Sequence, residues 1–341
     1  MSGDFDVHPE MASLIAAKQS AAQTAAATDA RAAWDAYGAS MRRPYPEGMV
    51  VRDATLPSRE RARSGIPVRI YRPRGVADPA PCVLYLHGGA FIKGSLESGD
   101  VVAWGVADQA KAIVVSVDYR LAPEHSFPAG LEDCYAALSH VAASGSELGV
   151  DPRRIAVWGD SAGGNLAAAL CLLTRDRGGP AIAAQALNYP CLTDELTAPS
   201  YRTYATSPGL ATASMESAWD QYLAGGRPTR NPYAAPLKAR DLGRLPPAHI
   251  HVAEIDPLAD DGRAYAARLG AAGCIVELRS AKRMIHGFLR ARFDGPGAAA
   301  EFAEPCAFLR QRLRSTKADV TPDRGPATFE PESASVIGRI P

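Results

Sequence analysis

One stretch of the chain reads Ile155-Ala156-Val157-Trp158-Gly159-Asp160-Ser161-Ala162-Gly163-Gly164. Its apolar first half predicts a short buried strand, and the Ala- and Leu-rich residues 165–173 predict a helix after the turn. A G-x-S-x-G turn between a strand and a helix needs small flanking residues and lifts its serine hydroxyl clear of the backbone. The helix N-terminus behind the turn favours negative charge. The stretch therefore predicts a nucleophilic serine at position 161.

Similar apolar runs recur along the chain and predict further strands, the first two forming a hairpin. These runs are 50–56, 68–71, 83–86, 113–117, 155–158, 184–187, 249–252 and 275–278. Most of the later runs are separated by stretches with helical periodicity, at 99–111, 130–143, 165–174 and 260–272. Strands that alternate with helices predict an α/β fold whose mostly parallel sheet is covered on both faces.

Two regions interrupt this alternation. Residues 11–40 are Ala-rich and predict one or two helices before the sheet, and no convincing strand lies between Pro190 and Leu245. An insertion there would lie above the carboxyl ends of the strands, where ligands bind in open α/β sheets. An ordinary connecting helix is the alternative. The predicted organisation is 1–45 N-terminal cap helices, 46–190 first part of the core, 191–244 cap insertion, 245–315 second part of the core and 316–341 disordered tail.

Composition excludes several classes of protein. The 341 residues contain 37 Lys plus Arg and 37 Asp plus Glu, so no basic surface for nucleic acid or membrane binding is expected. The chain has no run of eighteen apolar residues, and its polar first ten residues do not resemble a signal peptide. Its six scattered cysteines lack metal-site spacing and are typical of a reducing compartment. We therefore expect a cytoplasmic protein.

A serine nucleophile needs a base and an acid that orients the base, and in hydrolases of this kind both follow the serine. Three histidines follow Ser161. His249 and His251 alternate inside a strand pattern, which favours a structural role. His286 lies beyond the last predicted strand (274–280) and is followed by a glycine, so we predict it as the general base. Asp256 follows the preceding strand and is the predicted acid.

The oxyanion of an acyl-transfer reaction needs backbone amide donors. The amide of Ala162, directly after the nucleophile, is one predicted donor. The run 83–86 leads directly into His87-Gly88-Gly89-Ala90-Phe91. Gly88 and Gly89 can turn their amides toward the substrate without a side chain in the way, so both are predicted donors. His87 is interpreted as a structural residue of this loop.

These motifs together resemble the hormone-sensitive-lipase-like family of bacterial carboxylesterases, within the α/β-hydrolase superfamily. The resemblance covers roughly residues 45–312 and rests on His87-Gly88-Gly89-Ala90, Asp118-Tyr119-Arg120-Leu121-Ala122-Pro123-Glu124, Gly159 to Gly164, Asp256-Pro257-Leu258 and His286-Gly287-Phe288. It implies an α/β-hydrolase fold with a sheet of about eight strands, a helical cap, and no metal or cofactor. Ala90 stands where many members have a third glycine. The Arg120 and Glu124 side chains are expected to pair and brace the oxyanion loop.

The resemblance implies hydrolysis of short- to medium-chain carboxylic esters, with a small-molecule ester as the partner and no nucleic acid or membrane. Relatives often pair through the sheet edge, so a homodimer is possible. The predicted substrate pocket contains Phe91, Met215, Ile285 and Phe288, although core packing would explain each equally well. The motifs do not separate an esterase from a lactonase or amidase with the same triad. A non-catalytic receptor and a long-chain lipase are disfavoured alternatives.

Overall fold

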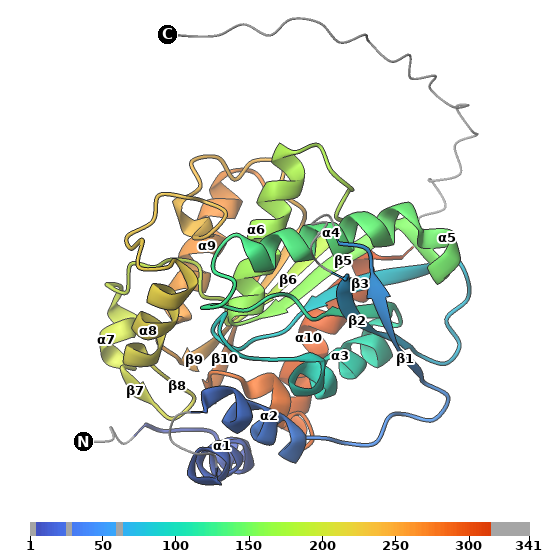
Figure 1. Cartoon of the computed structure of the whole chain (residues 1–341). Helices are drawn as coiled ribbons and strands as arrows, with labels where there is room; N and C mark the ends of the chain where they lie inside the picture. The colour runs from blue at the N-terminus through green and yellow to red at the C-terminus, as the bar shows by residue number, and fades with distance from the viewer. Residues whose placement is uncertain (1–4, 25–28, 59–63, 315–341) are drawn as a thin grey trace, which may run out of the picture.

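The computed structural model describes residues 5–24, 29–58 and 64–314. An eight-stranded sheet runs through the molecule (Figure 1). Its strands, in order across the sheet, are β1 (Val50–Leu56), β2 (Ile66–Arg72), β4 (Ile113–Val117), β3 (Ala80–Leu86), β5 (Val150–Asp160), β6 (Ala184–Asn188), β9 (Ala248–Ile255) and β10 (Val276–Ile285). The β1–β2 and β2–β4 pairs are antiparallel, and every other pair in this sheet is parallel.

Helices cover both faces of the sheet. One face packs against α4 (Ala129–Ala143), α6 (Ala162–Asp176) and α9 (Ala259–Ala271), and the other against α3 (Leu96–Ala110) and α10 (Pro296–Arg312). Strand β3 shows why both faces are apolar. Leu84 and Leu86 belong to the first core, whereas Val83 and Tyr85 belong to the second, because successive side chains point to opposite faces. A short helix, α5 (Gly145–Leu148), precedes β5.

The predicted α/β-hydrolase fold is confirmed, with every predicted strand and the four predicted core helices present. Two details differ. The sequence analysis did not predict α10, whose pattern is interrupted by Pro305 inside the helix. Strand β10 also extends beyond the predicted end at residue 280, through a register irregularity between Ala281 and Ile285. Periodicity did not show this extension because the exposed, charged Lys282 and Arg283 interrupt the apolar pattern between Ala281 and Met284.

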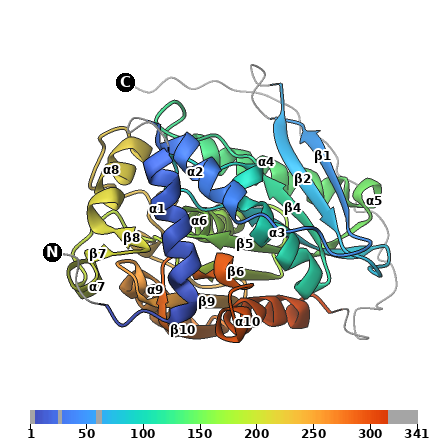
Figure 2. The same cartoon turned by 90° about the horizontal axis from the view of Figure 1, so that it is seen from below.

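Two separate segments lie outside this layered core. The N-terminal segment contains η1 (Pro9–Met11), α1 (Ala12–Thr24) and α2 (Ala30–Ser40), and Figure 2 shows α1 and α2 in front of the sheet. The segment after β6 contains α7 (Pro199–Thr203), β7 (Thr206–Ser207), β8 (Leu210–Ala211), α8 (Thr212–Tyr222) and η2 (Pro236–Lys238). A last 3-10 turn, η3 (Phe288–Ala291), precedes α10. The predicted disordered tail at 316–341 lies outside the described residues.

No helix within these described ranges is both long enough and apolar enough to cross a membrane.

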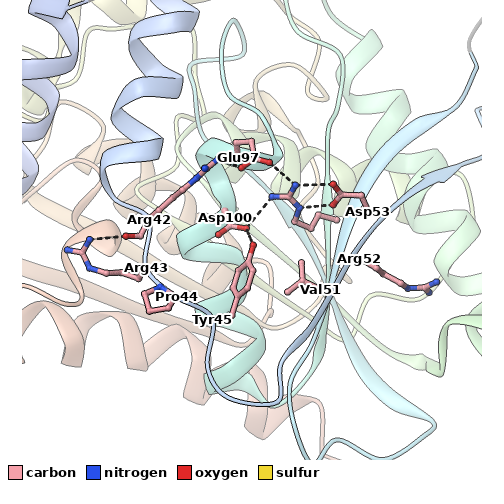
Figure 3. Close-up of a pocket in the computed structure, with 10 residues that line it drawn as sticks. Arg42, Arg43, Pro44, Tyr45, Val51, Arg52, Asp53, Glu97 and Asp100 are labelled. Carbon is pink, nitrogen blue, oxygen red and sulfur yellow. Dashed lines mark hydrogen bonds and ion pairs between the residues drawn. The ribbon is translucent and has the colours of Figure 1, made fainter.

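A surface hollow of about 520 Å³ lies where the chain passes from α2 to β1 (Figure 3). Its charged groups bind one another. Arg69 forms ion pairs with Asp53 and Glu97, each at 2.7 Å, and Asp100 accepts a hydrogen bond of 2.8 Å from the Tyr45 hydroxyl. This network joins β1, β2 and α3, so we interpret the hollow as structural.

Candidate active site

Ser161 occupies a strained turn between β5 and α6. Its backbone has φ 58° and ψ −118°, a conformation that L residues rarely adopt outside functional turns. The turn requires small neighbours, because a Cβ at Gly159 would lie 2.0 Å from the Gly163 carbonyl oxygen. A Cβ at Gly163 would lie 1.9 Å from the carbonyl oxygen of Leu86. The glycines of the motif are therefore demanded by backbone-to-backbone packing around the serine.

The three predicted triad residues come together at the carboxyl ends of the strands. Nε2 of His286 lies 2.9 Å from Oγ of Ser161, and Nδ1 of His286 lies 2.7 Å from Oδ2 of Asp256. Oδ1 of Asp256 accepts a hydrogen bond of 2.9 Å from the Leu258 amide, which fixes the carboxylate in place. Asp256 is completely buried, while Ser161 and His286 remain 7% and 6% exposed. A substrate can thus reach the hydroxyl but not the carboxylate.

Buried polar groups support the site from behind. Burial raises the pKa of Asp160, while Arg290, the Tyr85 hydroxyl and the Gly88 amide favour its ionised form. The Tyr85 hydroxyl donates a hydrogen bond of 2.8 Å to this carboxylate. Burial lowers the pKa of His87 to about 4, so the imidazole is neutral at neutral pH. The structural role predicted for His87 agrees with its stacking on Tyr119 inside the core.

The loop after β3 is tightly folded around Gly89. Gly89 has a φ of 144°, which side chains disfavour, and an added Cβ would lie 1.9 Å from the carbonyl oxygen of Lys93. The position therefore requires glycine. Ala90, which stands where many family members have a third glycine, has φ 55°. Its backbone thus adopts the left-handed conformation with alanine in place of glycine. Among the described residues, the amides of Gly89, Ala90 and Ala162 have no hydrogen-bond acceptor. These amides are available for a ligand.

The expected Arg120–Glu124 pair does not form, and that prediction was wrong. Arg120 instead pairs with Asp133 of α4 at 3.0 Å, because its guanidinium turns toward the core helix. Glu124 pairs with Arg31 of α2 at 2.5 Å. The sequence pattern could not find Arg31, since the two partners lie more than ninety positions apart and only the tertiary fold brings them together.

A cavity of about 670 Å³ opens onto Ser161, and its wall combines both outer segments with the core. Among its lining residues are Lys18, Trp34, Lys93, Leu210, Ser214 and Arg290. None of the four residues predicted for the substrate pocket lines it. Each is at most 2% exposed and belongs to the core, as in the stacking of Phe91 on Tyr222 with ring centroids 3.9 Å apart. The prediction was wrong because the four side chains pack into the core, and the apolar part of the cavity wall comes from other residues, such as Trp34 and Leu210.

Comparisons with known proteins agree with this architecture. The family model for the alpha/beta hydrolase fold matches residues 83–290. Carboxylesterase NlhH of Mycobacterium tuberculosis is 45% identical over 253 residues, which cover 73% of this chain and 79% of that protein. Esterase LipI of Mycobacterium tuberculosis is 46% identical over 228 residues, which cover 66% and 71% of the two chains.

Solved structures give the same result. A thermostable esterase from Pseudomonas putida superposes with a TM-score of 0.84 at 30% identity, covering 93% of this chain and all of the other. A bacterial heroin esterase superposes with a TM-score of 0.81 at 35% identity, covering 91% of this chain and 99% of the other. With its fold, its motifs and its relatives in agreement, the chain belongs to the hormone-sensitive-lipase-like carboxylesterase family of α/β hydrolases.

Proposed function

We propose that this protein hydrolyses short- to medium-chain carboxylic esters through an acyl-enzyme on Ser161. The observation that carries the proposal is the pair of contacts made by His286, 2.9 Å to the Ser161 hydroxyl and 2.7 Å to the Asp256 carboxylate. Both distances lie within the range required for proton transfer and for orienting the imidazole. The carboxylesterase and esterase relatives support ester hydrolysis as the reaction.

The proposed reaction has two halves. His286 accepts the proton of Ser161 as the serine oxygen attacks the ester carbonyl, and a tetrahedral oxyanion forms. His286 then donates this proton to the leaving alcohol, and the acyl group remains on the serine. Water repeats the sequence and releases the acid. Asp256 holds the imidazole in the correct tautomer and stabilises the imidazolium without taking the proton.

Backbone amides would stabilise the oxyanion, and we assign Gly89 and Ala162 to this role as the sequence predicted. Gly88 is the third predicted donor and lies beside Asp160, whose ionised form its amide favours. We add Ala90 as a further candidate, because its amide has no acceptor among the described residues. Removal of one such donor typically costs about 3 kcal/mol of transition-state stabilisation.

We propose that the two outer segments form a cap with the predicted bounds 1–45 and 191–244, because described residues of both segments line the cavity. A volume of about 670 Å³ suits a small or medium substrate rather than a long acyl chain. The proposed test is a comparison of 4-nitrophenyl esters from acetyl to dodecanoyl on purified wild-type protein and Ser161→Ala. Hydrolysis should be fastest at short to medium length and should fall by several orders of magnitude in the variant. A variant that stays active, or is still labelled by a fluorophosphonate probe, would exclude Ser161 as the nucleophile.

Two related predictions remain separate proposals. The first is that the protein is a lactonase or amidase with the same triad. Comparing hydrolysis rates on matched ester, lactone and anilide substrates distinguishes these activities from an esterase. The second is a homodimer formed through the edge strand β10, in which Leu278 is 50% exposed and which Ile275, 52% exposed, directly precedes. Light scattering on the purified protein measures its mass directly.

A further inference from the structure

Three cationic side chains from separate elements gather around one aromatic ring in the cavity. Lys18 of α1, Lys93 of the loop after β3 and Arg290 of η3 all line the cavity that opens onto Ser161. Their charged groups lie 5.8, 4.7 and 5.6 Å from the centroid of the Trp34 ring. The chain thus concentrates positive charge on one wall of its active site.

Several hydrogen-bond donors on this wall are unused. Within the described residues, Nζ of Lys93 forms no hydrogen bond or ion pair. Arg290 is 3% exposed and donates to the Ser98 carbonyl, but its buried Nη2 atom has no partner there. The buried indole Nε1 of Trp34 likewise has no partner among these residues. A ligand that carries hydrogen-bond acceptors would satisfy the Lys93 ammonium, which faces this wall without a partner among the described residues.

The cavity holds little negative charge to balance these cations. Asp29 is exposed and caps α2, where it accepts a hydrogen bond of 2.8 Å from the Ala32 amide. Asp160 is buried, accepts a hydrogen bond from the Tyr85 hydroxyl and interacts with Arg290, so it balances that cation rather than the two lysines. Burial, together with repulsion from Lys93 and Arg290, lowers the pKa of Lys18 to about 7, and burial also lowers the pKa of Lys93. A bound anion would favour the charged form of both lysines.

We propose, building on the esterase function above, that the Trp34 wall binds a carboxylate group carried by the substrate. Lys18 and Lys93 supply ammonium groups, and the Arg290 guanidinium adds positive charge beside the Trp34 ring. The substrates are then esters that bear a second, ionised carboxyl group. Charge-assisted hydrogen bonds of this kind are about twice as strong as neutral ones and give both orientation and specificity.

The position of Lys18 indicates which part of the ester carries the carboxylate. Its Nζ donates to the Gly209 carbonyl in the β7–β8 turn. This turn lies directly against the catalytic histidine, because a Cβ at Gly209 would lie 2.7 Å from the His286 amide nitrogen. The leaving alcohol receives its proton from His286 and therefore departs on this side. We accordingly place the carboxylate on the alcohol half of the substrate.

The test uses two pairs of esters that differ only in charge. The first pair, 4-acetoxybenzoate and its methyl ester, has the carboxylate or its neutral form on the alcohol half. The second pair, 4-nitrophenyl hydrogen adipate and its methyl ester, has it on the acyl half. The measured quantity is the ratio of kcat/KM for the acid to kcat/KM for the methyl ester. Because structural damage affects both members of a pair, this ratio reports the charge interaction.

Lys18→Met and Lys93→Met should each lower this ratio about tenfold for the acetoxybenzoate pair, as expected for loss of one charge-assisted hydrogen bond. Lys282→Met is the matched control, since Lys282 is 76% exposed and pairs with Glu254 outside the cavity. Its ratio should not change. In the wild type, 0.5 M NaCl should lower the ratio of acid to methyl ester for the acetoxybenzoate pair, because salt screens the attraction between the carboxylate and the lysines. Unchanged ratios in both lysine variants would overturn the proposal, and a change confined to the adipate pair would overturn the assignment to the alcohol half.

A binding measurement separates this proposal from the esterase function itself. Calorimetric titration of Ser161→Ala with 4-acetamidobenzoate and with its methyl ester requires no catalysis. The acid should bind at least tenfold more tightly than the methyl ester, and this preference should disappear in Ser161→Ala combined with Lys93→Met. Equal affinities would reject the carboxylate site even in an active esterase. Absence of hydrolysis with every ester, together with tight binding of the acid, would instead reject the proposed reaction.

Discussion

Arg31 of α2 forms an ion pair with Glu124 at 2.5 Å and so ties the outer helices to the catalytic core. The two side chains are 43% and 57% exposed, and an ion pair of this kind contributes at most about 1 kcal/mol. The same guanidinium also donates to the carbonyl oxygens of Ile92 at 2.8 Å and Ala122 at 2.9 Å. Ile92 belongs to the tight loop that contains Gly88 and Gly89. Arg31 thus positions the proposed oxyanion loop from outside the core.

Replacement of Arg31 should therefore slow catalysis more than it weakens substrate binding. We expect Arg31→Ala to lower kcat about tenfold, because the loop loses its Ile92 carbonyl contact and the link through Arg31 to Ala122 and Glu124 after β4. Arg31→Lys should not restore the rate, since an ammonium lacks the planar fork of donors. Glu124→Gln, which removes the charge alone, should change kcat less than twofold. Steady-state kinetics with 4-nitrophenyl butyrate test this order, and equal effects in Arg31→Ala and Glu124→Gln would contradict it.

Asp256→Asn should reduce kcat by about four orders of magnitude while the fold persists. An amide of the same shape can hold the imidazole in the wrong tautomer and cannot stabilise the imidazolium, which is the loss known for serine triads. Asp260→Asn is a suitable control, because Asp260 lies in the next helix and pairs with Arg263. Its kcat should remain within twofold of wild type. Circular dichroism checks folding, and substantial activity in Asp256→Asn would assign the acid to another residue.

Because Gly89 is closely packed, we predict that its replacement by alanine causes a large loss of activity. Gly89→Ala places a Cβ against the Lys93 carbonyl at a backbone angle that alanine avoids, so the loop must move. We expect kcat to fall at least a hundredfold through lost oxyanion stabilisation. Gly270→Ala in α9 has nothing within 4 Å of the new Cβ and should instead stabilise the protein by about 0.5–1 kcal/mol. An active Gly89→Ala enzyme would remove this loop from the mechanism.

Buried neutral histidines predict a loss of stability in mild acid. Burial lowers the pKa of His87 to about 4 and that of His249 to about 3, against an ordinary value of 6.5. Between pH 6.5 and pH 4 the unfolded chain binds protons that the folded chain excludes, so the free energy of unfolding falls as pH falls. Each fully excluded proton contributes a slope of about 1.4 kcal/mol per pH unit.

Urea unfolding at intervals from pH 7.5 to pH 5 measures this slope. His249→Leu should make the dependence shallower by about one proton, because the variant has one fewer excluded site. Restricting the range to pH 5 and above keeps most carboxylates ionised in both states. Parallel pH dependences for wild type and His249→Leu would show that the folded protein protonates this imidazole or that other groups dominate.

The sequence alone predicted most of the fold because this fold depends on local patterns. Alternating apolar runs and helical periodicity specify strands and helices, and the glycines at 159 and 163 are required by backbone packing within a single turn. The same locality explains why Ser161, Asp256 and His286 could be chosen before their distances were known. Each follows the carboxyl end of a strand, and parallel strands bring such positions to one edge of the sheet.

What determines the substrate could not be predicted in this way, since it depends on contacts between distant segments. The proposed pocket residues were chosen as large and apolar, and such side chains were buried in the core instead, where their transfer from water contributes most. The predicted partner of Arg120 was wrong for a similar reason. Its partner is the acid that the fold brings close, Asp133, and not the acid nearest in sequence. The sequence by itself determined the layered sheet and the chemistry at its edge. Only the tertiary structure decided that Lys18, Trp34 and Lys93 share one wall, because two helices from the start of the chain fold back over the site.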